Sequence, residues 1–155
     1  MNTTYTKLSF KTLYALLAIA AVTLVAACGK SDETVSNYGS LSIYNASPTL
    51  ATYDVYVNDS KLNTVALPYA GGVKYTQLTE GSYTVKYTVA TETGSVYTKT
   101  GISVGNNSVS TLYLAGTAGN FDGVLTSDEF SATSSDKAYV RLINLSPDAP
   151  ALDLA

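Results

Sequence analysis

Short segments in which apolar and polar residues alternate recur along the chain from Ser40 onward. Because successive side chains of a β-strand point to opposite faces, this period of two predicts half-buried strands. The alternation is clearest in residues 83–89, where Tyr, Val, Tyr and Val occupy every second position. The pattern predicts strands at 41–45, 53–57, 62–67, 73–78, 83–89, 96–104, 109–114 and 139–144.

Turn-forming residues separate these segments, and no convincing helical periodicity occurs after residue 39. Residues of this kind tolerate left-handed backbone or form Asx turns. They stand at Asn58-Asp59, Gly71-Gly72, Glu80-Gly81, Thr93-Gly94 and Gly105 to Asn107. Seven or eight short strands in about 100 residues predict an all-β fold, an antiparallel β-sandwich of two sheets.

The N-terminal segment has a different composition and is set aside from the fold. Lys7 and Lys11 give it positive charge without an acidic residue, and residues 13–25 form an uncharged apolar run of 13 residues. A membrane-spanning helix needs about 20 such residues. The run therefore has the length of a signal-peptide core, and residues 1–27 are predicted to be a lipoprotein signal peptide.

The end of this segment, Val25-Ala26-Ala27-Cys28, resembles the lipobox of bacterial lipoproteins. The resemblance implies cleavage after Ala27 and attachment of a lipid to the thiol of Cys28, which is the only cysteine of the chain. Acyl chains contribute about 0.8 kcal/mol per buried methylene, so several of them anchor a protein stably. An ordinary signal peptide that contains a cysteine, or a buried helix, is the alternative.

Residues 28–39 are polar and are expected to form a short tether. Within them, Lys30-Ser31-Asp32-Glu33 resembles the export signal that sends some Bacteroidetes lipoproteins to the cell surface, although a solvated linker explains these four residues equally well. We therefore expect an outer-membrane lipoprotein of the bacterial cell envelope. Whether it faces the periplasm or the cell surface stays open.

Two segments separated by 99 residues are similar without a gap. Residues 41–48 align with 140–147, with Asn, Ser and Pro identical, and Asp54 aligns with Asp153 in the same register. Such a spacing is the size of one sandwich domain.

The similarity predicts a module at 40–135 and the start of a second, incomplete module at 139–155. So few residues cannot bury a core of their own. Either the chain is truncated within the second module, or its last strand packs on the first module and covers an open sheet edge.

The second copy continues as Ser146-Pro147-Asp148-Ala149-Pro150 and then Asp153 between two leucines. This stretch resembles the opening of the DUF4397 family, an uncharacterised bacterial extracellular domain that often occurs in tandem on lipoproteins. The first copy keeps Ser47, Pro48 and Asp54 but lacks the other Asp and the second Pro. The resemblance covers about 40–155 and implies an immunoglobulin-like β-sandwich, without implying a reaction.

Considered by themselves, the motif residues indicate architecture more than chemistry. Proline fixes φ, and Ser or Asp side chains bond nearby amides, so residues 146–150 are expected to form a rigid turn. A motif present in each copy favours a structural role. Asp54 and Asp153 are candidates for binding a cation or acting as acids, but hydrogen bonds to a turn are the preferred interpretation.

Composition excludes several classes of function. The chain has no His and one Cys, which removes Ser-His-Asp and Cys-His catalysis, His-ligated metals, thiolate zinc clusters and intramolecular disulfides. With 9 Lys+Arg, 12 Asp+Glu and a pI near 4.7, it lacks the basic surface that nucleic acid requires. We expect no cofactor.

One segment partly matches a calcium-binding EF-hand loop. Asn120, Asp122, Gly123 and Glu129 have the spacing of positions 3, 5, 6 and 12. The first position would be Ala118, which cannot bind a cation, and no helices flank the segment. We therefore predict a loop and no metal site.

These features favour a non-enzymatic, lipid-anchored module of the cell envelope that binds a glycan or a protein. Thirteen tyrosines supply aromatic surface for such contacts. A structural spacer is the alternative, and a glycosidase that uses two carboxylates about 5–10 Å apart is a third. The sequence does not identify the ligand or the oligomeric state.

Overall fold

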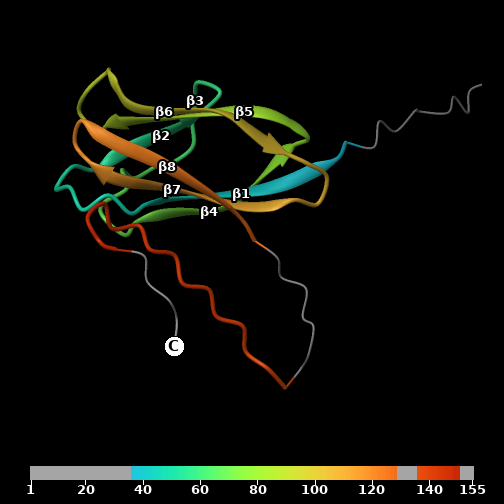
Figure 1. The fold of residues 1–155 in the computed structure, drawn as a ribbon. Coiled ribbons are helices and arrows are strands. Elements are labelled where there is room, and N and C mark those ends of the chain that lie inside the picture. The colour runs from blue at the N-terminus through green and yellow to red at the C-terminus, as the bar shows by residue number, and fades with distance from the viewer. Residues whose placement is uncertain (1–35, 129–135, 151–155) are drawn as a thin grey trace, which may run out of the picture. The chain divides into compact units, whose positions relative to one another are not determined.

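The computed structural model describes residues 36–128 and 136–150 (Figure 1). The predicted signal peptide and most of the tether, with Ala27 and Cys28, lie outside the described residues. In the described part of the chain, no helix has the length and apolar character needed to cross a membrane.

The described residues form two four-stranded sheets that stack on each other (Figure 1). The strands are β1 Tyr38–Asn45, β2 Tyr53–Val57, β3 Ser60–Lys61, β4 Gly72–Thr79, β5 Gly81–Val89, β6 Ser95–Val104, β7 Val109–Thr117 and β8 Asn120–Ser127. One sheet has the order β4-β1-β7-β8 and the other β3-β2-β5-β6. The prediction of an all-β, two-sheet sandwich is confirmed, and the likeness to immunoglobulin domains lies in this architecture rather than in their strand order.

One strand pair departs from the expected antiparallel arrangement. β1 lies between β4 and β7, and it pairs with β7 in parallel, with Tyr44 opposite Tyr113. Parallel pairing requires a long crossover, which the strands of the other sheet supply. Because Ser40 pairs with Val109 and Ser110 with Ser127, β1 begins and β8 ends at the same end of the sandwich.

The core lies between the sheets and follows the predicted alternation. Every second residue of β1 points inward, so Leu41 and Ile43 are buried, and Leu112 and Leu114 of β7 are buried with them. The rings of Tyr53 and Tyr87 meet edge to face, with centroids 6.4 Å apart. Such aromatic pairs contribute about 0.5–1.5 kcal/mol beyond the area they bury.

The strand predicted at 62–67 is wrong. This segment forms one isolated β-bridge with β2, between Tyr53 and Leu67, and no ladder. The side chain of the buried Asn63 makes two of the hydrogen bonds that a neighbouring strand would make. Its Oδ1 accepts the Val55 amide at 2.8 Å, and its Nδ2 donates to the Tyr53 carbonyl at 3.0 Å. Backbone groups of β2 therefore bond to a side chain at this edge, where the prediction placed a neighbouring strand.

The end of the module also differs from the prediction. The segment interpreted as a Gly-, Asn- and Asp-rich loop forms β8, which pairs with β7 along its whole length, from Thr117–Asn120 to Ser110–Ser127. A turn at Ala118 and Gly119, with Gly119 at φ +83°, joins the two strands. In contrast, residues 139–144 were predicted as a strand and have no ladder partner among the described residues.

Candidate functional site

The motif of the first copy builds a buried turn after β1. Asn45 Oδ1 accepts a hydrogen bond from the Ser47 amide at 3.1 Å, and Asn45 Nδ2 donates to the Leu67 carbonyl at 3.3 Å. Ser47 Oγ donates to the Gly116 carbonyl of β7 at 2.8 Å. Asn45 and Ser47 are both 0% exposed, whereas Pro48 is exposed. These contacts support the structural interpretation of Ser47.

The motif of the second copy repeats the same local turn on the surface. Asn144 Oδ1 accepts the Ser146 amide at 3.1 Å, and Ser146 Oγ donates to Asp148 Oδ1 at 2.8 Å. Asn144 Nδ2 donates to the Pro150 carbonyl at 3.0 Å. Pro147 is exposed and forms a bend of the chain together with Asp148. The turn therefore forms from local sequence alone.

Asp54 holds two strands together. It is 9% exposed on β2, and its Oδ2 lies 2.7 Å from Lys61 Nζ of β3. The hydrogen bond to Asp54 raises the pKa of Lys61. Its equivalent Asp153, like Glu129 of the EF-hand comparison, lies outside the described residues.

The residues of the EF-hand comparison that are described belong to β8. Asp122 pairs with Ala115, and its Oδ1 accepts the amide of Gly123 at 2.8 Å. No cluster of three metal-ligating side chains occurs in residues 36–128 and 136–150.

The structure brings three tyrosines together on the outer face of the β4-β1-β7-β8 sheet. We call Tyr44, Tyr75 and Tyr113 the tyrosine face. Tyr44 and Tyr113 are direct neighbours on β1 and β7, and their rings stack with centroids 5.8 Å apart. Tyr44 is 39% and Tyr75 45% exposed, while Tyr113 is half-buried.

A glycine on β4 leaves space for the Tyr44 ring. Gly72 is the register partner of Tyr44, and a Cβ built on Gly72 would lie 2.4 Å from the Tyr44 ring. The ring therefore lies against bare backbone on one side and the ring of Tyr113 on the other. This packing restricts the side chain before any ligand arrives.

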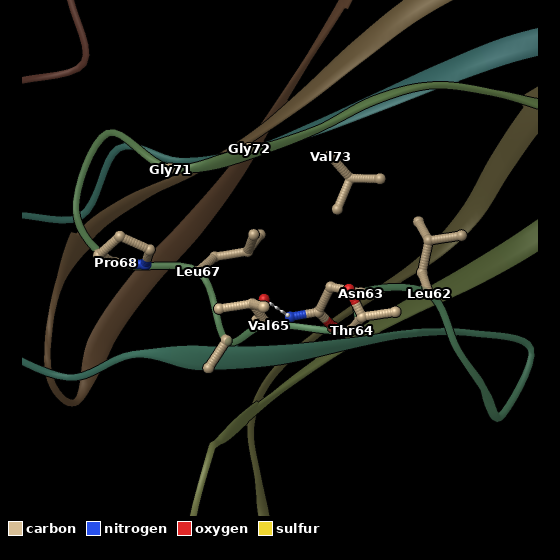
Figure 2. A pocket seen from close by; sticks show the side chains of 10 residues that line it. Leu62, Asn63, Thr64, Val65, Leu67, Pro68, Gly71, Gly72 and Val73 are labelled. Carbon is tan, nitrogen blue, oxygen red and sulfur yellow. Dashed lines mark hydrogen bonds between the residues drawn. The ribbon is translucent and has the colours of Figure 1, made fainter.

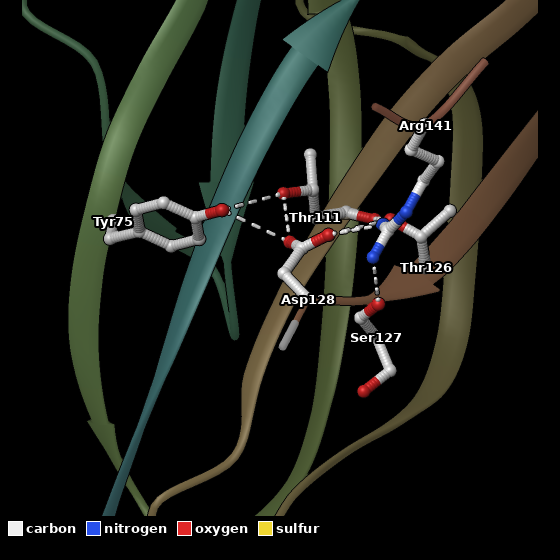
Figure 3. A network of polar contacts seen from close by, with 6 residues as sticks. All are labelled: Tyr75, Thr111, Thr126, Ser127, Asp128 and Arg141. Carbon is white, nitrogen blue, oxygen red and sulfur yellow. Dashed lines mark hydrogen bonds and ion pairs between the residues drawn. The ribbon is translucent and has the colours of Figure 1, made fainter. Parts of the chain in front are cut away.

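The third tyrosine belongs to a polar network at the end of β8 (Figure 3). Asp128 Oδ2 accepts the Thr111 hydroxyl at 2.5 Å and the Tyr75 hydroxyl at 3.0 Å. Asp128 Oδ1 accepts Arg141 Nη1 at 2.6 Å, and Arg141 Nη2 donates to the Ser127 carbonyl at 2.9 Å.

The network sets the charge of its central carboxylate. Burial raises the pKa of Asp128, but the hydrogen bonds from Thr111, Arg141 and Tyr75 together outweigh it and hold the pKa below its ordinary value. The Asp128 side chain is only 10% exposed, and that of Arg141 is 47% exposed. Asp128 is therefore an ionised, nearly buried anchor for Arg141.

Two hollows of the described surface contain few ionisable side chains. One, of about 370 Å³, is lined by residues 62–68 and 71–73, none of which is ionisable (Figure 2). The other, of about 510 Å³, lies between the β7–β8 turn and residues 144–147 and contains one carboxylate, Asp122. Neither hollow holds the pair of carboxylates that glycoside hydrolysis needs.

Fold and surface together define a small all-β module with an aromatic face. The chain belongs to the family described as "Domain of unknown function (DUF4397)", which matches residues 39–155. This confirms the family resemblance seen in the sequence.

Comparison with curated proteins finds no match. Among solved structures, the C-terminal domain of AlgF from P. aeruginosa is similar, with a TM-score of 0.41 and 10% sequence identity. The match covers 60% of this chain and 98% of that one.

Sequence reasoning placed no tyrosine on the surface. The signal was present, because Leu41 and Ile43 alternate with Ser42 and Tyr44 and so assign Tyr44 to the outer face. The contact between Asp128 and Arg141 had no such signal, since it joins residues through tertiary structure alone.

Proposed function

We propose that this chain is a non-catalytic binding module of the bacterial cell envelope, held at the membrane by a lipid on Cys28. In this proposal the tyrosine face contacts the ligand, a glycan or a protein. The observation that carries the proposal is the stacked pair Tyr44 and Tyr113, with Tyr44 39% exposed on an ordered sheet.

Aromatic side chains suit this role because they provide large contact areas at a small entropic cost. Tyrosine has few rotatable bonds, and it joins an apolar ring to a hydroxyl that forms hydrogen bonds. The packing of Tyr44 against Gly72 and Tyr113 restricts it further, so binding would order little that is not already ordered.

A paired substitution tests the binding surface. We expect the double variant Tyr44→Ala with Tyr113→Ala to lose binding by about tenfold or more in glycan arrays and in retention on immobilised envelope proteins. Tyr69→Ala is the matched control, because Tyr69 is 60% exposed but lies in the loop before β4. Equal binding of the wild type and the double variant, both folded by circular dichroism, would rule out this surface.

The anchor is tested separately. We expect the wild-type chain to fractionate with membranes and Cys28→Ser to be released, with loss of label from a fatty-acid probe. Protease treatment of intact cells then distinguishes a surface-facing from a periplasmic protein. Membrane association of Cys28→Ser equal to that of the wild type would contradict the lipid anchor.

A structural spacer is the second candidate, and the repeated turn favours it. Asn45 and Asn144 build the same local geometry, as expected when copies of one module follow one another. If an unrelated sandwich of equal size replaced residues 40–128 without loss of function in the cell, the spacer would be supported and specific binding rejected.

A further inference from the structure

The internal repeat assigns a face to each residue of the second copy. In β1 of the first copy, Leu41 and Ile43 point into the core, whereas Ser42 and Tyr44 belong to the outer face. With the offset of 99 residues, Val140 and Leu142 occupy core positions, and Arg141 and Ile143 occupy outer positions.

The structure leaves both core positions open to solvent. Val140 is 74% and Leu142 52% exposed, while Arg141 between them, with its side chain 47% exposed, is bonded to Asp128 of the first sandwich. The second copy thus turns its outer-face side toward the first sandwich. Its core-position side chains face solvent.

We propose that the contact between Arg141 and Asp128 is the junction between two consecutive sandwiches of this family. It clamps the second copy, through the outer position Arg141, to the end of β8. Val140 and Leu142 are thereby presented to a partner of defined kind, the remainder of a second sandwich. By analogy with β1, that partner supplies an antiparallel strand equivalent to β4 and a parallel strand equivalent to β7.

Asp128 is suited to this role because the first sandwich fixes it in advance. Hydroxyls of Tyr75 and Thr111 bind one carboxylate oxygen, and Thr126 Oγ1 lies 3.3 Å from the other. A nearly buried carboxylate held in this way presents one defined direction to a guanidinium.

Arginine is suited to the other side. Its two Nη atoms bind two different groups, the Asp128 carboxylate and the Ser127 carbonyl, which fixes the orientation of the segment and not only its distance. A lysine ammonium is a point charge and would fix the orientation of the segment less well.

Packing beyond the clamp is loose. The hollow of about 510 Å³ lies between residues 144–147 and the β7–β8 turn. We therefore expect the two bonds of Arg141 to contribute strongly to the orientation of the segment. A single substitution should release the segment without unfolding the first sandwich.

The first experiment measures NMR relaxation of the backbone amides in the full chain. We expect Arg141→Ala to lower the order parameters of residues 139–147 toward those of a flexible backbone, with Arg141→Lys intermediate. Lys137→Ala removes a charge from the same segment and is the matched control. The melting temperature of the sandwich should change little in all three. Equal order parameters in the wild type and Arg141→Ala would overturn the clamp.

The second experiment completes the second copy. Ala155 aligns with Tyr56, so appending residues 57–128 after Ala155 supplies the remaining strands in register. We expect this extended chain to form two sandwiches that tumble together by NMR relaxation, and Arg141→Ala to uncouple them. Independent tumbling in the unsubstituted extended chain would overturn the proposal.

A substitution in the extended chain tests the open face. Val140→Asp with Leu142→Asp should prevent folding of the second sandwich in the extended chain, yet leave the stability of the 155-residue chain unchanged. If the second sandwich folds in spite of both substitutions, these positions do not enter its core. The outcome is independent of ligand binding by Tyr44 and Tyr113, so this inference and the proposed function can fail separately.

Discussion

Asn45 accepts a hydrogen bond from the amide two residues ahead at 3.1 Å, and Asn144, 99 residues later, does the same at 3.1 Å. The two turns differ in their surroundings. Asn45 is 0% exposed and also donates to the Leu67 carbonyl, whereas Asn144 lies on the surface. One local geometry therefore occurs once inside a packed module and once outside it.

This pair gives a matched prediction. We expect Asn45→Ala to lower the free energy of unfolding by about 2–3 kcal/mol, because the buried Ser47 amide and Leu67 carbonyl lose their partner. Asn144→Ala should change it by less than about 0.5 kcal/mol, since water replaces the lost bonds. Urea denaturation followed by tyrosine fluorescence measures both. A similar loss in the two variants would contradict the assigned difference in burial.

Two core tyrosines should respond in opposite directions to loss of the hydroxyl. Among the described residues the buried Tyr87 hydroxyl has no hydrogen-bond partner, and burial raises its pKa. Tyr87→Phe should therefore be neutral or stabilise by up to about 1 kcal/mol. Tyr53→Phe should destabilise by about 1 kcal/mol, because the Tyr53 hydroxyl lies 2.8 Å from Thr49 Oγ1. Thermal unfolding by calorimetry compares them, and a clear loss in Tyr87→Phe would indicate an unrecognised partner.

Acid should weaken the module through Asp128. Its folded-state pKa lies below the ordinary value of 3.8, so ionised Asp128 stabilises the fold fully above that value. The contribution is lost as the pH falls through the lower, folded-state pKa. We expect Asp128→Asn to flatten this part of the stability profile, measured by urea midpoints from about pH 7 to about pH 2. An unchanged slope below about pH 4 would show that other carboxylates dominate.

Two glycines with the same backbone angle should differ in tolerance. Gly116 and Gly119 both have φ +83°, but a Cβ on Gly116 would lie 2.2 Å from the Asn120 carbonyl oxygen, and one on Gly119 meets nothing within 4 Å. Gly119→Ala adds backbone strain of about 1–2 kcal/mol. Gly116→Ala adds a clash to the same strain and should cost at least about 3 kcal/mol. Equal losses of unfolding free energy in chemical denaturation would mean that β8 moves away from the Gly116→Ala methyl group without an energetic cost.

The sequence predicted those strands whose side chains alternate between a core and a surface. The strands expected near 41–45, 53–57, 73–78, 83–89, 96–104 and 109–114 are all present. The turn at Asn58 and Asp59 is also confirmed, with φ of 46° and 67°. In these segments local pattern and tertiary burial agree, which is why periodicity sufficed.

The errors arose where tertiary contacts decide. Apolar residues at 62–67 suggested a strand, but Asn63 binds the β2 backbone and prevents a ladder. Asn120, Asp122 and Gly123 suggested a loop, yet pairing with β7 makes them a strand, and Gly123 leaves room for the Tyr97 ring. Neither outcome follows from the residues' own preferences.

The candidate surface was predicted even less completely. Strand alternation identifies the outer positions, but only the strand order brings β1, β4 and β7 together and so unites Tyr44, Tyr75 and Tyr113. The meeting of Asp128 with Arg141 likewise depends on the path of the chain after β8. Pattern reasoning has no access to such long-range neighbours.

The chain enters β1 and leaves β8 at the same end of the sandwich, and this has a mechanical consequence. A sandwich entered and left at one end therefore adds little to the end-to-end length of the chain. Most of that length comes from the run between Arg141, beside Asp128, and Pro147, near the opposite end of β8. Tension applied between Tyr38 and Pro147 would peel this run away first. The Arg141–Asp128 contact would then yield under load before any strand of the sheet is pulled.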